Sequence, residues 1–285
     1  TMNRLAGVLQ DQGRYPESQD AYKSCLKEQR ATLGDYHPDT LETMISLAVT
    51  LLEQGDYPEA LRLCESSLER QKRILGPDHP DTLETMNHLA GVFQEQGKYS
   101  KARGLYEMCL KRQKAILGEY HPHTLETMID LAVTLQEQGK YPKARGLYEA
   151  TLDIQKDVLG EDHPDTLETV GHLASLYQVQ GKYAKAVELY ESNLERREAH
   201  LGKDHPDVLT TKKKLATTLA KQGSYTKAQL LFESCLDRLT SILGREHPDT
   251  LETMSDLAVT LKGQGKFSEA QRLNESCLES QRSIL

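Results

Sequence analysis

Six histidines, each followed by proline, are the first candidates for chemistry in this chain. They recur at 42-residue intervals, at His37, His79, His121, His163, His205 and His247. Imidazole nitrogens transfer protons and bind metals through bonds of about 2 Å, so such a series could form an acid-base or metal site. Copies of a two-helix unit, however, stack roughly 20 Å apart, too far for neighbouring histidines to share an ion. We therefore interpret each His-Pro as a loop where proline breaks the chain before a helix, and we expect no metal and no cofactor.

Five cysteines are the second candidates. Four of them share one repeat position with small or polar residues of other copies, the full set being Cys25, Ser67, Cys109, Thr151, Asn193, Cys235 and Cys277. Whole repeats separate these cysteines, which argues against disulfides, and no CxxC or Cys-His spacing indicates zinc. We predict reduced packing residues. No nucleophile-base constellation and no phosphate-binding glycine loop appears, so we expect no catalytic residues and no enzymatic activity.

Almost everything else in the chain repeats with the same period. Gln-Gly and Leu-Ala keep step with His-Pro, which indicates one supersecondary unit copied in tandem along a single solenoid domain, residues 1–285. Because the chain starts and stops within a copy, we expect it to be a piece of a longer protein. The predicted repeats are 1–34 (truncated), 35–76, 77–118, 119–160, 161–202, 203–244 and 245–285.

One copy, residues 77–118, predicts two helices. Asp81 is the expected N-cap of helix A, with Glu84 at capping-box spacing, and apolar residues then recur at three- and four-residue steps until Gln96-Gly97. A tight turn holding Tyr99 leads to helix B, which closes at Gly118. Two antiparallel helices in each copy leave no strands, so the predicted fold class is all-α.

Charge and composition exclude several classes of partner. The net charge is −8 and the sequence pI is near 5.7, with basic and acidic residues interspersed. A duplex nucleic-acid binder needs a concentrated basic face, so we expect no nucleic acid. Signal-peptide and membrane-spanning patterns are absent from the sequence, which predicts no membrane contact and a cytoplasmic protein.

The helical pattern resembles the tetratricopeptide repeat. In one copy the resemblance rests on Leu89, Ala90, Phe93, Tyr99, Ala102, Tyr106 and Cys109. The usual unit has about 34 residues, and the longer unit here is similar to the repeats of kinesin light chains and of the sensor arrays on NB-ARC-type nucleotide-binding receptors. The resemblance implies a right-handed α-α superhelix, a solenoid of about seven repeats whose helices A line a concave groove.

The candidate binding residues are the helix A positions that differ between copies. The pair before Leu-Ala changes in size and charge while the core positions stay nearly invariant, as expected for a recognition surface. We predict that Lys213 faces the groove most directly, near His172, and that the lysines bind an acidic stretch of a partner. The predicted ligand-binding residues are Asn87, His88, Gln94, Asp130, Gln136, His172, Gln178, Lys213 and Lys214.

The predicted function is a scaffold that binds a protein or peptide in this groove, as the ligand-sensing segment of a larger NB-ARC-type receptor. A kinesin-light-chain-like cargo adaptor and a purely architectural, self-assembling spacer are the alternatives. End-to-end self-association is a further expectation, because solenoids need polar terminal caps and the last copy presents apolar residues. These are Leu273, Cys277, Leu278 and Leu285.

Overall fold

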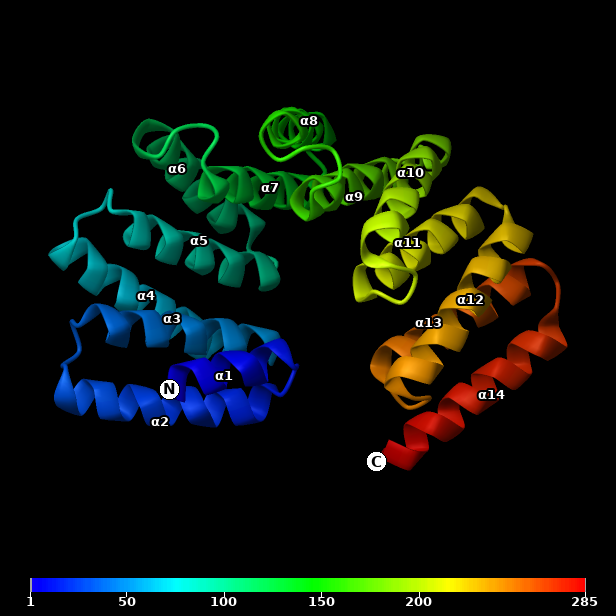
Figure 1. The fold of residues 1–285 in the computed structure, drawn as a ribbon, viewed down its shortest axis with the longest axis horizontal. Helices are drawn as coiled ribbons and strands as arrows, with labels where there is room; N and C mark the ends of the chain where they lie inside the picture. Colours follow the sequence, from blue (N-terminus) through cyan, green and yellow to red (C-terminus); the bar gives the residue numbers. More distant parts are fainter. Residues whose placement is uncertain (1, 285) are drawn as a thin grey trace. The chain divides into compact units, whose positions relative to one another are not determined.

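The computed structural model describes the backbone of residues 2–284 and the side chains of residues 2–280. Throughout the described chain the secondary structure is helical, with two helices for each copy and no strand, which confirms the predicted all-α class (Figure 1). The helices are α1 (Met2–Asp11), α2 (Tyr15–Thr32), α3 (Pro38–Glu53), α4 (Tyr57–Ile74), α5 (Pro80–Glu95), α6 (Tyr99–Ile116), α7 (Pro122–Glu137), α8 (Tyr141–Val158), α9 (Pro164–Val179), α10 (Tyr183–Leu201), α11 (Pro206–Gln222), α12 (Tyr225–Leu243), α13 (Pro248–Gly263) and α14 (Phe267–Ile284).

The contacts divide the chain into two compact units. Unit 1 is Thr1–Leu147 and unit 2 is Tyr148–Leu285, and the boundary between them lies within α8. Unit 1 therefore holds α1 to α7, and unit 2 holds α9 to α14. The single domain stays a prediction, and each unit is described by itself.

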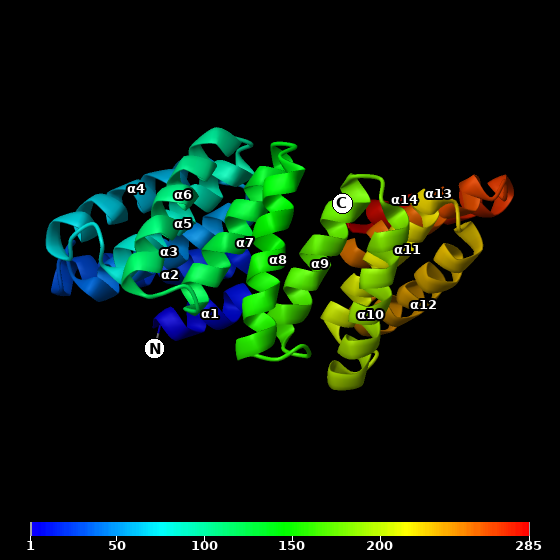
Figure 2. The ribbon, with the colours of Figure 1, turned by 90° about the horizontal axis from the view of Figure 1, so that it is seen from above.

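Within each unit the helices form two layers. Each helix packs against the next one along the chain, and the odd-numbered helices also contact one another, α1 with α3, α3 with α5, and α5 with α7. Unit 2 repeats this pattern, with contacts of α9 with α11 and of α11 with α13 (Figure 2). The odd-numbered helices are the predicted helices A, so in each unit they form one continuous surface, called here the helix A layer.

The start of helix A differs from the prediction. α5 begins at Pro80, and its N-cap is His79, whose Nδ1 accepts a hydrogen bond of 3.3 Å from the backbone N–H of Asp81. The same cap, 3.2 Å long, occurs at the other five His-Pro pairs. The prediction that Asp81 is the N-cap was wrong. Proline lacks an N–H and suits the first helical position, so the N-cap is the residue that precedes proline.

The ends of the helices follow the glycines. Gly97 and Gly118 have φ values of 69° and 92°, in the left-handed region that glycine adopts without strain. The N–H of Lys98 donates to Phe93 O at 2.8 Å, which closes α5, and α6 then begins directly at Tyr99. Tyr99 therefore lies in the first turn of α6. The prediction that it lies in the turn before this helix was wrong.

Small residues in helix B bring the two layers into contact. Ala102 is fully buried at the start of α6, which packs against both α5 and α7. Further along α6, Cys109 Sγ donates to the carbonyl oxygen of Leu83 on α5 at 3.3 Å. At the same repeat position in unit 2, Asn193 donates to Leu167 O at 2.6 Å. All five cysteines are buried and free, which confirms the prediction of reduced packing residues.

Candidate functional site

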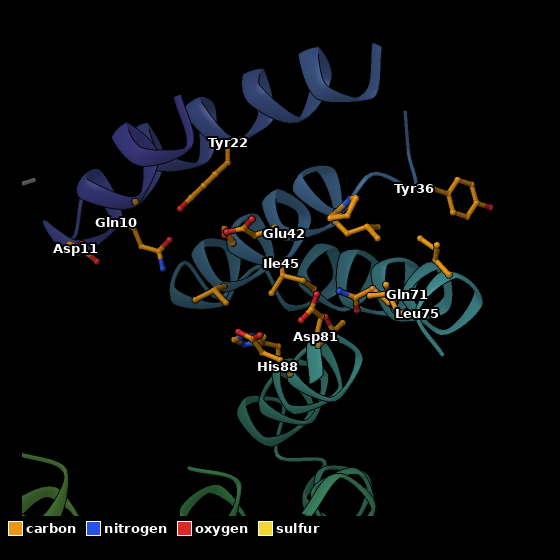
Figure 3. Close-up of a pocket in the computed structure, with 18 residues that line it drawn as sticks. Gln10, Asp11, Tyr22, Tyr36, Glu42, Ile45, Gln71, Leu75, Asp81 and His88 are labelled. Carbon is orange, nitrogen blue, oxygen red and sulfur yellow. The ribbon is translucent and has the colours of Figure 1, made fainter. Parts of the chain in front are cut away.

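The helix A layer of unit 1 opens into a cavity of about 610 Å³. Residues of α1 to α5 line it, and Figure 3 shows Glu42 and Ile45 of α3, Gln71 of α4 and His88 of α5 around the same space. Aliphatic side chains, among them Ile45 and Leu75, cover part of the wall. A hollow of this size, partly apolar and partly polar, is typical of a binding site.

A second cavity of unit 1, of about 270 Å³, holds four of the nine predicted site residues. Asn87, His88 and Gln94 reach it from α5, and Asp130 reaches it from α7. The two cavities share lining residues, including His88, so they adjoin along the helix A layer. The structure thus brings these four side chains together, and their contact with a ligand stays a prediction.

Two of these predicted side chains also link neighbouring copies. Asn87 Nδ2 donates to Thr127 Oγ1, and Thr134 Oγ1 donates to Gln94 Oε1 at 2.5 Å. Both bonds join α5 to α7. Asn87 and Gln94 are therefore held in place before any ligand arrives, which lowers the entropic cost of binding.

His88 lines both cavities, and it lies near a carboxylate. Its Nε2 is 3.9 Å from Glu84 Oε1, and hydrogen bonding to His88 lowers the pKa of Glu84. Glu84 therefore stays ionised in the wall of both cavities.

Unit 2 has a separate cavity of about 250 Å³ on its helix A layer. His172 of α9 and Lys214 of α11 line it, together with Arg197 of α10. The ring of His172 stacks on Tyr148, with centroids 5.7 Å apart and an interplanar angle of 10°. Burial, followed by the nearby Arg197 charge, lowers the pKa of Lys214. Glu168 and Asp207 line the same cavity, and Asp207 pairs with Arg197 at 3.3 Å, so the cavity carries charges of both signs.

The lysine nearest to His172 differs from the prediction. Lys214 shares the cavity with His172, whereas Lys213 is paired with Glu252 of α13 and its side chain is only 17% exposed. The prediction that Lys213 lies near His172 was wrong, and its role in binding stays a prediction. Successive residues of a helix point about 100° apart, and only the packing of α11 against α13 decides which lysine turns towards the neighbouring helix.

The last two predicted residues lie outside these cavities. Gln136 is half-buried on α7, and within the described chain its buried Oε1 has no hydrogen-bond partner. Gln178 is half-buried on α9 and lines none of the three cavities. Their binding role stays a prediction.

Sequence reasoning missed a column of glutamines on helix B. Gln71 lines the larger cavity of unit 1 and Gln113 the smaller one, and they are only 6% and 1% exposed. The buried Oε1 of each has no hydrogen-bond partner among the described residues. The signal was present, because Gln29, Gln71, Gln113 and Gln155 recur at the 42-residue period on a stripe that otherwise reads as core.

Comparison with protein families gives a match over nearly the whole chain. The model described as "Tetratricopeptide repeat" matches residues 1–63, 47–115, 85–157, 124–178, 165–241 and 213–283. The chain belongs to the tetratricopeptide repeat family. No curated protein matches it.

Three solved structures illustrate the similarity. A candidate kinesin light chain of Podosopora anserina, built from nearly identical TPR-like repeats, is 30% identical with a TM-score of 0.64, over 72% of this chain and 98% of that one. BtubC (BKLC) from P. vanneervenii is 21% identical with a TM-score of 0.63, over 86% and 92% of the two chains. The apo quorum sensor NprR from B. thuringiensis is 16% identical with a TM-score of 0.60, over 98% and 86%. The last two share the fold.

Neither a metal site nor a membrane-spanning segment occurs in the described part of the chain. Its histidines, cysteines and carboxylates nowhere come together in a group of three that could hold a metal ion. None of its helices combines the length and apolar character needed to cross a membrane.

Proposed function

We propose that this tetratricopeptide array is a scaffold that binds a peptide or a protein segment on its helix A layer, without catalysis, in the cytoplasm. One observation carries the proposal. The helix A positions that vary between copies, such as His88 and Lys214, line cavities in both units, whereas the core positions repeat. A fixed scaffold with variable polar groups on rigid helices suits recognition, since little ordering is needed on binding. The array needs neither nucleic acid nor a membrane for this role.

We further propose that the chain is the ligand-sensing segment of a larger NB-ARC-type receptor. The support is the resemblance of its 42-residue unit to the arrays of such receptors. A cargo adaptor is the second candidate, favoured by the 30% identity to a candidate kinesin light chain. The parent polypeptide discriminates between them, because a nucleotide-binding module and a heptad coiled coil have different sequence patterns. An architectural spacer would bind no ligand in either unit.

Selection from a library of random linear peptides tests the binding proposal without assuming a ligand. Selected peptides are labelled and titrated by fluorescence anisotropy against the chain, the cavity variant Lys214→Glu and the variant Glu65→Lys. Glu65 is exposed on α4 and lines none of the three cavities, so it is the charge-reversal control. We expect peptides that use unit 2 to lose affinity by about tenfold or more with Lys214→Glu and to keep it with Glu65→Lys. Failure of any peptide to bind would favour the spacer.

We also propose that two copies of this chain associate through exposed apolar faces. On α1, Leu5 and Val8 are 56% and 51% exposed, and on α14 Leu278 is 53% exposed. Cys277 is buried and Leu273 half-buried, so they are not part of such a face, and Leu285 lies outside the described residues. Burying exposed apolar side chains favours association.

Sedimentation velocity over a wide concentration range tests this association. The double variant Leu5→Ser, Leu278→Ser should remain monomeric at concentrations where the parent chain associates. Leu230 is 62% exposed on α12, and Leu230→Ser is the matched control, which should behave as the parent does. A parent that stays monomeric throughout would contradict the proposal.

A further inference from the structure

The larger cavity of unit 1 contains a buried polar group that the fold does not use. Gln71 is 6% exposed, and its buried Oε1 accepts no hydrogen bond from any described residue. A buried carbonyl oxygen without a donor is costly, and most such atoms in folded proteins are paired. Gln71 lines the cavity, so its side-chain amide is part of the wall that a ligand would contact (Figure 3).

The same feature recurs in the adjoining cavity. Gln113 is 1% exposed and also has a buried Oε1 without a partner in the described chain. The fold itself does not require glutamine there, because in copy 203–244 of unit 2 the same repeat position is Leu239, which packs in a core cluster. The glutamines of helix B therefore provide acceptors at the 42-residue period, with Gln71 and Gln113 at the two cavities of unit 1 and Gln155 in unit 2.

Apart from a histidine, the charged side chains that line the larger cavity are all acidic. Its lining includes the carboxylates of Asp11, Glu42, Asp81 and Glu84 and no lysine or arginine. Glu84 and Asp81 each lie near a histidine, at 3.9 Å from His88 and 3.6 Å from His79. Asp11 and Glu42 form no ion pair with any described residue. The smaller cavity adds Glu95, Glu126 and Asp130, also without lysine or arginine.

The acceptors lie beside apolar surface. Ile45 and Val49 of α3 and Leu75 at the end of α4 line the same cavity. Tyr36 and Ile74 lie at its edge with half of their surface exposed. A suitable ligand therefore combines hydrogen-bond donors of positive charge with aliphatic groups.

We propose that unit 1 binds a basic peptide segment in which arginine side chains lie next to aliphatic ones, with a guanidinium group donating to Gln71 Oε1 and facing the carboxylate of Glu42. This rests on the proposed peptide-binding function and names its ligand class. Arginine matches the site because its guanidinium has five donors and no acceptor, and because it is less strongly hydrated than an ammonium group. The aliphatic neighbour fills the space between Ile45 and Leu75.

A labelled peptide of sequence Ser-Leu-Arg-Ser-Leu-Arg-Ser, blocked at both ends, tests the proposal by fluorescence anisotropy with the full chain. Three matched peptides replace arginine with citrulline, arginine with glutamate, or leucine with serine. Citrulline keeps the shape of arginine but not its charge. We expect the arginine peptide to bind about tenfold or more tightly than each of the three. Its affinity should also fall as salt rises, because the charges are partly exposed.

Two variants locate the peptide. Glu42→Gln, at an exposed position, should weaken binding about three- to tenfold and reduce its salt dependence. Gln71→Leu should weaken it by a similar factor without changing the salt dependence, and Leu239 shows that this repeat position accepts leucine. Glu65→Gln, on the exposed face of α4, should leave binding unchanged, and circular dichroism checks that all variants stay folded.

Several results would overturn the proposal. Equal affinity for the arginine and citrulline peptides would exclude charge recognition, and unchanged affinity in Glu42→Gln and Gln71→Leu would place the peptide elsewhere. Binding of arginine amide as tightly as the peptide would make this a small-cation site. If library selection yields only acidic peptides that depend on Lys214, the proposed function stands and this inference fails.

Discussion

Replacing Ala102 with leucine lowers the free energy of unfolding by about 1 to 3 kcal/mol. Ala102 is fully buried in α6, which packs against α5 and α7. A larger side chain there forces neighbouring side chains out of their preferred rotamers or moves the helices apart, because protein interiors are close-packed. Chemical denaturation followed by circular dichroism measures the change.

Ala115→Leu, in the same helix, is the matched control. Ala115 is exposed near the end of α6, so the same substitution adds its methyl groups to solvent and changes the stability by no more than about 0.5 kcal/mol. A loss of similar size in both variants would mean that helix propensity, and not packing at Ala102, sets the cost.

The second large effect concerns an ion pair in the core of unit 2. Lys212 of α11 is only 8% exposed, and its Nζ lies 3.2 Å from Glu198 Oε1 on α10. Glu198→Gln removes the opposing charge and leaves a buried ammonium group, which should lower the free energy of unfolding by about 1 to 3 kcal/mol. Lys212→Met should be neutral or stabilising, because replacing a buried charge with a well-packed apolar side chain removes the cost of burying it.

A double-mutant cycle checks this interpretation. Five other copies carry methionine at the position of Lys212, and four of these residues, Met44, Met86, Met128 and Met254, are buried. In the Lys212→Met background, Glu198→Gln should cost less than about 0.5 kcal/mol. Equal costs of Glu198→Gln in both backgrounds would mean that Glu198 stabilises unit 2 by some other contact.

The charges that line the cavities differ between the two helix A layers. The cavities of unit 1 are lined by carboxylates without lysine or arginine, whereas the cavity of unit 2 has Lys214 and Arg197 beside the carboxylates of Glu168 and Asp207. Nearly every core position is repeated between the units, so this difference arises at exposed and half-buried positions. Such positions change charge with little effect on folding, which allows one scaffold to carry different binding surfaces.

The sequence by itself determined the helices and their order. Amphipathic spacing, Gln-Gly and His-Pro act within a few neighbouring residues, so a single copy predicts where its two helices lie. The glycines at the helix ends behave as predicted because positive φ is a local property of the residue. The sequence also predicted that the repeat position of Cys109 needs a small side chain, because the residues at this position in different copies share only their small size.

Only the tertiary structure decided which side chains face one another. His79 is a cap and not a free loop residue because Pro80 starts the helix, and Lys214 instead of Lys213 reaches His172 because α13 offers Glu252. Gln71 reads as part of a core stripe in the sequence, yet packing leaves it at a cavity with an unpaired oxygen. Periodicity gives the direction of a side chain about its own helix, and the partner that it meets depends on the neighbouring helix.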